Sequence, residues 1–263
     1  MRKHFLGILC AFLVVATSFI SWTPVENAEP AKNKVASTAK EVFEQYVNTI
    51  YKTANLQQAG LDVSVFQKAL TGYINLKQAN KLPQNSNIIT VVDFTKSSRE
   101  KRMWIIDMLN NQVLLNTWVA HGQGSGDDMA NQFSNTNESH QSSLGFYVTN
   151  DVYVGKHGRS LRLNGMDEGF NTAALARGIV VHAADYVSQG TINQIGRLGR
   201  SFGCPAVSPQ VISQVINTIK GKSMLFINGN DSRYTSKYLD ESGLTDTTKF
   251  LASQTLSAHT ASL

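Results

Sequence analysis

The stretch VVHAADYVSQGTINQIGRLGRSFGCPAV, residues 180–207, decides how the rest of the chain is interpreted. Its β-branched start predicts a short strand over residues 178–182, which ends on His182. Its close, RSFGCP over residues 200–205, is a bend whose glycine allows close backbone approach to Cys204. An imidazole at a strand end and a thiol in a glycine-flanked bend, 22 residues apart in the chain, are the features that suggest chemistry.

Cys204 has the sequence surroundings of a nucleophile. Ser208 as N-cap, with Pro209 at the first helical position, predicts a helix that begins shortly after the thiol. A helix N-terminus lowers the pKa of a nearby thiol, and the thiolate is the reactive form. Because a free thiol has a pKa of about 8.5, it also needs a base, and we expect His182 to be that base. Backbone amides at Gly203 or Cys204 are expected to stabilise the oxyanion of an acyl transfer.

This stretch resembles the active-site signature of the L,D-transpeptidases of bacterial cell-wall synthesis, in which a His precedes a Ser/Thr-x-Gly-Cys motif on a YkuD-like fold. The segment SSLGFYV, residues 142–148, looks like a variant of that family's Thr-Pro-x-Gly-x-Phe segment. The resemblance covers about residues 88–230 and implies a catalytic domain of this type. The matching residues are His182 for the general base and Ser201, Gly203 and Cys204 for the motif.

The chain departs from the family pattern at three places, which makes it similar to the divergent branch known as murein L,D-transpeptidase catalytic-domain-like. Phe202 stands where the family commonly has His, and Ala183 stands where it has Gly. PAV, residues 205–207, replaces a segment that commonly holds Arg or Asn. If the family's Arg in this segment binds a carboxylate of the substrate, Arg200 or Arg197 takes that role here. The alternative is that Arg200 and Arg197 are both solvated cations of the loop.

The resemblance implies a specific reaction. Cys204 attacks the carbonyl of the third residue of a peptidoglycan stem tetrapeptide, often diaminopimelate, and the terminal D-alanine leaves. The resulting thioester passes to an amine, and a carbapenem is expected to form an adduct with the same thiol. Ser201 either hydrogen-bonds within the site or stabilises the turn. The second ring nitrogen of His182 needs an acceptor, either a backbone carbonyl, as is common in the family, or Asp185. No cofactor is implied.

Two alternatives keep the same fold. Water instead of an amine as acceptor makes the protein an L,D-carboxypeptidase, and loss of activity, marked by Phe202, makes it a non-catalytic wall-binding domain. Papain-like and NlpC-type peptidases are disfavoured because their Cys precedes their His. A metallopeptidase is disfavoured because the sequence has no HxH or HExxH spacing and only one thiol in the mature chain, so no metal site is predicted.

Composition places the chain among globular proteins. Its 263 residues (28.9 kDa) are 42% apolar and 16% charged, which excludes wholesale disorder. The net charge is +5, but the basic residues are scattered and form no clustered stripe. We therefore expect no nucleic-acid partner.

The first 28 residues read as an export signal, with a basic start at residues 1–4 and an apolar run over residues 5–20. The apolar run is short for a membrane crossing, although an uncleaved N-terminal anchor is the alternative, and no other membrane segment is expected. Cys10 lies in this run and leaves with it, so Cys204 is the lone thiol of an exported protein. We expect a periplasmic or extracellular protein associated with the cell wall.

The remaining pattern predicts an α+β fold that is mainly β. Two amphipathic stripes predict a helical N-terminal region over residues 36–83, after a polar link at 29–37. The second stripe has Asp62 as its expected N-cap and comprises Val65, Phe66, Ala69, Leu70, Tyr73 and Ile74. The Ser- and Thr-rich residues 240–263 read as a flexible tail. HGQGSG, residues 121–126, lacks the lysine of a phosphate loop and reads as a mobile loop whose His121 lines the cleft. The expected strands cover residues 88–94, 103–109, 112–120, 144–150, 153–163, 178–182 and 224–228, with a hairpin at Asn110-Asn111 and one helix interrupting them over residues 208–221.

Overall fold

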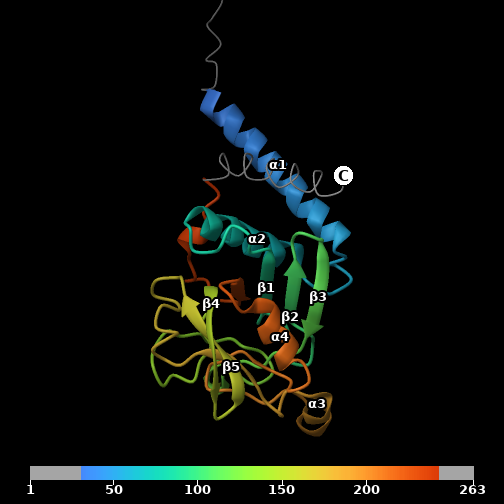
Figure 1. Cartoon of the computed structure of the whole chain (residues 1–263), viewed down its shortest axis with the longest axis vertical. Helices are drawn as coiled ribbons and strands as arrows, with labels where there is room; N and C mark the ends of the chain where they lie inside the picture. The colour runs from blue at the N-terminus through green and yellow to red at the C-terminus, as the bar shows by residue number, and fades with distance from the viewer. Residues whose placement is uncertain (1–30, 243–263) are drawn as a thin grey trace, which may run out of the picture.

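The computed structural model describes residues 31–242, with side chains from residue 40 onward. The predicted export signal, residues 1–28, and the part of the predicted tail beyond residue 242 lie outside the described residues. Within the described part, no helix combines the length and the hydropathy that crossing a bilayer requires. The chain has an α+β fold that is mainly β, with helices packed against one large sheet (Figure 1).

The sheet has eight strands. They are β1 (Ile88–Asp93), β2 (Met103–Asp107), β3 (Gln112–Thr117), β4 (Gly145–Gly155), β5 (Gly158–Gly165), β6 (Val180–Ala183), β7 (Ala206–Val207) and β8 (Met224–Asn228). Their order is β3-β2-β1-β8-β4-β5-β6-β7, and only the pairs β1–β8 and β6–β7 are parallel. Three residues beyond β3, Ala120 exchanges backbone hydrogen bonds of 2.8 and 3.3 Å with Ala206. The two edges of the sheet therefore meet beside β7.

The strand pattern in the sequence located most of these strands, and the hairpin between β2 and β3 places Asn111 at φ 49°, as expected. The expected strand over residues 153–163 is wrong. The chain reverses at Lys156-His157, and β4 pairs with β5 from that turn downward, Gly155 opposite Gly158. Gly155 and Gly158 flank the reversal and were the available turn signal, and Gly158 takes the positive φ of 71°.

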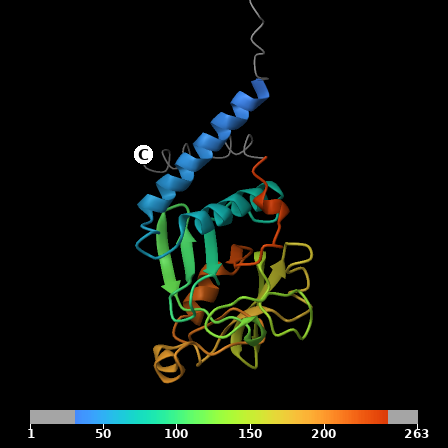
Figure 2. The ribbon, with the colours of Figure 1, turned by 180° about the vertical axis from the view of Figure 1, so that it is seen from behind.

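Two helices, α1 (Ala31–Thr53) and α2 (Val63–Gln78), lie on one side of the sheet (Figures 1 and 2). α1 is already helical at Ala31, so the expected polar link over residues 29–37 is corrected from residue 31 onward. Asp62 is the N-cap of α2, as the sequence predicts, and its carboxylate accepts a 2.7 Å hydrogen bond from the Ser64 amide. That bond satisfies one of the amides a helix start leaves without a partner.

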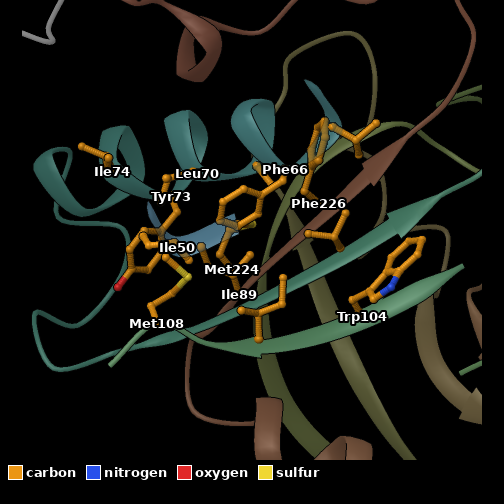
Figure 3. Packing of buried hydrophobic residues seen from close by; sticks show 14 of the residues in the cluster. Ile50, Phe66, Leu70, Tyr73, Ile74, Ile89, Trp104, Met108, Met224 and Phe226 are labelled. Carbon is orange, nitrogen blue, oxygen red and sulfur yellow. The ribbon is translucent and has the colours of Figure 1, made fainter. Parts of the chain in front are cut away.

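The helical layer and the sheet share one apolar core. Figure 3 shows Phe66 and Leu70 of α2 facing Ile89 and Phe226 of the sheet, with Trp104 beside them. Burying a side chain of this size contributes roughly 1.5–3 kcal/mol. The whole predicted face of α2 is buried, namely Val65, Phe66, Ala69, Leu70, Tyr73 and Ile74. The core therefore fixes β1 and β8, two adjacent interior strands of the sheet.

The other face of the sheet packs against α4 (Ile212–Ile219), whose buried side chains belong to a second apolar cluster. The expected helix start at Ser208 is wrong. The Ser208 carbonyl accepts hydrogen bonds from the Val211 and Ile212 amides, but residues 209–211 form a turn, and no side chain caps the helix. β7 occupies residues 206 and 207, so a strand separates Cys204 from the helix.

A short helix, α3 (Gln189–Ile195), was absent from the sequence prediction. Ser188 caps its start with a 3.2 Å bond to the Thr191 amide, and Gly196 ends it with φ 75°. None of its residues is buried. Its two apolar residues, Ile192 and Ile195, are too few to form the stripe that periodicity detects.

Candidate active site

Cys204 lies in the loop between α3 and β7, where its sulfur faces the first residues of β6. The Val180 amide donates a 3.4 Å hydrogen bond to Sγ, and the thiol donates to the Gly178 carbonyl oxygen at 3.7 Å. Burial raises the pKa of this half-buried thiol, while the Val180 amide and the charges of Arg177 and Lys156 lower it. Because burial is the largest effect, the resting group is a thiol and needs a base before it reacts.

His182 is held in one orientation by its own strand. Its Nδ1 lies 2.8 Å from the Ala183 carbonyl oxygen, an arrangement in which Nδ1–H donates and Nε2 keeps its lone pair. Burial lowers the pKa of His182, and the nearby His157 and Lys156 lower it further, against the Ala183 hydrogen bond. The ring is therefore neutral at pH 7, and its free nitrogen can accept a proton.

The thiol and the imidazole open on the same cavity, of about 400 Å³. The parallel register of β6 and β7 brings them together, because His182 pairs with Ala206, two residues beyond Cys204. A larger cavity of about 770 Å³ lies elsewhere and is lined by no thiol or imidazole, so volume does not identify the site. The described residues that line the smaller cavity are Tyr153, Gly155, Lys156, His157, Arg177, Gly178, Val180, His182, Tyr186, Arg200, Ser201, Phe202 and Cys204.

Hydrogen bonds brace the loop that carries the thiol. Ser201 Oγ donates to the Cys204 carbonyl at 2.6 Å and accepts from the Gly203 amide at 3.1 Å, and Ser142 Oγ donates to the Gly203 carbonyl at 3.1 Å. Gly203 has φ 119°, and a Cβ there would lie 2.7 Å from the Gln141 carbonyl oxygen, so only glycine fits. Since the Gly203 amide is already bonded, the Cys204 amide is the better candidate for holding an oxyanion.

The predicted substrate contacts have different placements. Arg200 lines the cavity, but its Nη1 is bonded to Asp127 at 2.9 Å and to the Gly126 carbonyl at 2.8 Å. The structure places His121 away from the cavity, 1% exposed, with Nδ1 2.8 Å from Arg102 Nη2. Arg197 does not line the cavity either and donates to the Leu198 carbonyl at 2.7 Å.

Arg177 lines the cavity together with Cys204, and no motif in the sequence indicated this residue. Its guanidinium donates to the Ser134 and Gln141 carbonyls, both at 2.7 Å, and to the hydroxyls of Ser139 and Ser143. It thus ties residues 134–143 to the start of β6. An arginine directly before a short buried strand was the only available signal, and it is a weak one.

One further expectation about the chemistry is corrected, and the structure decides between the two acceptors considered for the His182 ring. Cys204 is not next to a helix N-terminus, so no helix dipole lowers the pKa of its thiol. The acceptor for the His182 ring is the Ala183 carbonyl and not the carboxylate of Asp185. His157 is exposed and also packs on His182, with ring centroids 4.4 Å apart.

Metal ligands do not gather here: among residues 31–242 no group of three or more His, Cys, Asp or Glu side chains is arranged to hold a metal ion. The only free cysteine of the described chain is Cys204. The cavity is lined by a thiol, a neutral imidazole and cationic side chains, which are the groups that nucleophilic acyl transfer requires.

Solved structures that match part of this chain include an L,D-transpeptidase from Mycobacterium smegmatis, with 12% identity, a TM-score of 0.35 and coverage of 55% of this chain and 59% of that one. L,D-transpeptidase 3 from Mycobacterium tuberculosis, in complex with a faropenem-derived adduct, has 12% identity, a TM-score of 0.34 and coverage of 55% and 61%. The helical cell shape determining protein Pgp2 from Campylobacter jejuni has 13% identity, a TM-score of 0.38 and coverage of 70% and 63%.

The chain thus spans about three fifths of the length of these structures. No curated protein matches the chain. The YkuD_2 family model, described as the L,D-transpeptidase catalytic domain, matches residues 57–228, which is more than half of the chain. The chain therefore belongs to the L,D-transpeptidase catalytic domain family.

Proposed function

We propose that the protein is an exported cysteine L,D-transpeptidase that acts on the stem tetrapeptides of peptidoglycan. In this proposal residues 1–28 direct export, and the domain works at the cell wall, in the periplasm or outside the cell. The observation that carries the proposal is the single cavity on which the Cys204 thiol and the His182 imidazole both open. Family membership supports the reaction class.

The acylation step follows from the resting protonation states. His182 Nε2 takes the Sγ proton as the sulfur bonds to the carbonyl carbon of the third stem residue, and the carbonyl oxygen becomes an oxyanion. The Cys204 amide donates to that oxygen. When the carbon–nitrogen bond breaks, the imidazolium returns its proton to the amine of D-alanine, and a thioester remains on Cys204.

In the transfer step, the proton moves through His182 from the incoming amine to the sulfur. An incoming amine attacks the thioester carbonyl, His182 accepts a proton from that amine, and the sulfur leaves as a thiol after receiving the proton. Burial supports this cycle, because it favours the neutral thiol and the neutral imidazole over a permanent ion pair. The Ala183 hydrogen bond supports it too, because it stabilises the transient imidazolium.

The first test is a covalent adduct. The protein is incubated with a carbapenem, or with a stem tetrapeptide, and its intact mass is measured. We expect a mass gain that is absent in Cys204→Ala, and an adduct that forms roughly 10²–10⁴-fold more slowly in His182→Gln because the general base is lost. An unchanged mass gain in Cys204→Ala would remove the nucleophile assignment.

Product analysis then separates the alternatives. Cross-linked dimers among the muropeptides support amine transfer, whereas tripeptides alone would make the protein an L,D-carboxypeptidase. Binding to sacculi that persists in His182→Ala, with neither adduct nor product from the parent protein, would make it a non-catalytic wall-binding domain.

A further inference from the structure

We propose that Lys156, at the tip of the β4–β5 hairpin, binds a carboxylate of the acyl donor close to the bond that is cleaved. The inference rests on the proposed function for the identity of the donor. It assigns a specificity role to a residue in the turn that the strand pattern concealed.

The cavity has the charge of an anion site. Its ionisable lining includes Lys156, Arg177 and Arg200, together with His157 and His182, and none of its described lining residues is an Asp or a Glu. Substrates that present a carboxylate are therefore attracted into it, and the low dielectric of a partly enclosed cavity strengthens that attraction.

Three lining side chains, those of Lys156, Arg177 and Arg200, carry a permanent positive charge, and the two arginines already have partners. The Nη atoms of Arg177 donate four hydrogen bonds to residues 134–143. Arg200 is paired with Asp127 at 2.9 Å, so its charge is compensated before any substrate arrives. Lys156 is different, because in the part of the chain that the structure describes it makes no ion pair or hydrogen bond.

The hairpin holds Lys156 near the reacting groups. The neighbouring His157 ring packs on His182 at 4.4 Å between centroids, and close to the turn the Arg162 guanidinium lies 4.1 Å from the Tyr153 ring centroid. The charge of Lys156 lowers the pKa of both Cys204 and His182, which is consistent with an ammonium close to both. A carboxylate held by this ammonium is therefore near the scissile carbonyl.

Two carboxylates of the donor meet this description, one on the terminal D-alanine and one on the side chain of a third-position diaminopimelate. The Lys ammonium is a point charge on a flexible stem and can bind either. The ligand chemistry is the same for both, so the experiment uses one amidated ligand for each position.

Equilibrium binding tests the proposal without turnover. The ligands are the free tetrapeptide, its C-terminal amide and its third-residue side-chain amide, each titrated against Cys204→Ala and against Cys204→Ala with Lys156→Gln. We expect Lys156→Gln to weaken binding of the free tetrapeptide roughly 10- to 100-fold, the effect of losing a charge-assisted hydrogen bond. One amide should bind equally weakly to both proteins, and that amide identifies the carboxylate.

Lys222→Gln is the matched control, because Lys222 is exposed in the turn after α4 and does not line the cavity. It should leave all three affinities unchanged, and Lys156→Arg should restore most of the binding. Equal weakening of all three ligands by Lys156→Gln, no weakening, or no measurable binding of the free tetrapeptide would overturn the proposal. The proposed function fails separately, when the parent protein gives neither a Cys204 adduct nor product.

Discussion

At the scale of single residues, Arg102 is a fully buried cation whose bonded partners are uncharged. Its guanidinium donates to the Val119 and Lys96 carbonyls and reaches His121 Nδ1 at 2.8 Å. Because a guanidinium only donates, Nδ1 accepts, and the Nε2 proton of His121 points to the Gly126 carbonyl at 3.3 Å. His121 thus anchors residues 121–126.

Backbone hydrogen bonds connect His121 to the loop that carries Cys204. The His121 carbonyl accepts a 3.0 Å hydrogen bond from the Ser201 amide, and the Gln123 amide donates to the Ser201 carbonyl at 2.7 Å. Ser201 in turn braces Cys204. His121 is therefore a positioning residue and does not touch a substrate in the cavity.

This environment predicts how stability depends on pH. Burial first, and then the charge of Arg102, lower the pKa of His121 from 6.5 to about 4. The unfolded chain therefore binds this proton at higher pH than the folded protein does, so folding is destabilised as pH falls from 6.5 towards 4. We expect His121 to account for a loss of about 3 kcal/mol in the free energy of unfolding across that window, measured by urea denaturation at several pH values.

His121→Gln is the informative variant, because an amide can accept from Arg102 and donate to Gly126 without titrating. It should lose the part of the pH dependence that comes from His121, while His157→Gln, at an exposed site, should keep it. A pH profile of His121→Gln as steep as that of the parent protein would show that other groups control acid stability.

At the scale of elements, the contact between α2 and β4 depends on a glycine. A Cβ at Gly72 would overlap the ring of Phe146, which stacks on Phe226 with centroids 4.4 Å apart. Both rings are fully buried, so the Phe146 ring has little room to move. Gly72 lowers the helix propensity of α2 at this position, but it lets the helix lie close to the sheet.

We expect Gly72→Ala to destabilise the protein by about 1–3 kcal/mol, because overpacking outweighs the gain in helix propensity. Gly190→Ala in α3 is the matched control. A Cβ there meets only Ser188 Oγ at 3.7 Å, an ordinary contact, so this variant should be neutral or stabilised by up to about 1 kcal/mol. Thermal or urea unfolding of both variants gives the comparison, and equal stability changes would contradict the packing argument.

At the scale of the whole molecule, the helical region over residues 36–83 and the catalytic domain over residues 88–230 share one core. The apolar cluster includes Phe43, Val47 and Ile50 of α1 together with strand residues such as Phe226. Trp104 in β2 also donates a 2.8 Å hydrogen bond to the Ala59 carbonyl in the link between α1 and α2. Neither part can separate without exposing this surface to water.

We therefore expect the two regions to unfold in one cooperative transition. Tryptophan fluorescence is measured in Trp118→Phe, so that Trp104 is the one tryptophan left among the described residues, and it should give the same midpoint as far-ultraviolet circular dichroism, which reports on all elements. A first transition that releases Trp104 while the β signal persists would show that the helical region is an independent unit.

The sequence predicted much of the architecture because its signals are local. The buried face of α2, its Asp62 cap and the strands β1, β2 and β8 follow from periodicity and from capping chemistry. Failures occurred where the local pattern was uninformative or favoured another structure. The exposed α3 has no stripe, and the Ser-Pro pair before α4 fits a helix start but forms a turn.

Only part of the candidate site could be predicted from the sequence. The motif suggested Cys204, His182 and Ser201, and these three line one cavity. Arg177 and Lys156 carry no motif, and they enter the cavity because the loop before β6 and the β4–β5 turn lie close together in the folded sheet. Contacts between segments this far apart in the chain depend on strand order and register, which periodicity does not encode.

By itself, the sequence determined the fold class and the family, and it predicted Cys204 and His182 as the reactive pair, because residue type and spacing record which side chains a chain buries and which motif it carries. Only the tertiary structure decided the chemical state of that pair. The raised pKa of Cys204 and the lowered pKa of His182 come from desolvation, and desolvation exists only once distant strands and loops have closed around the two groups.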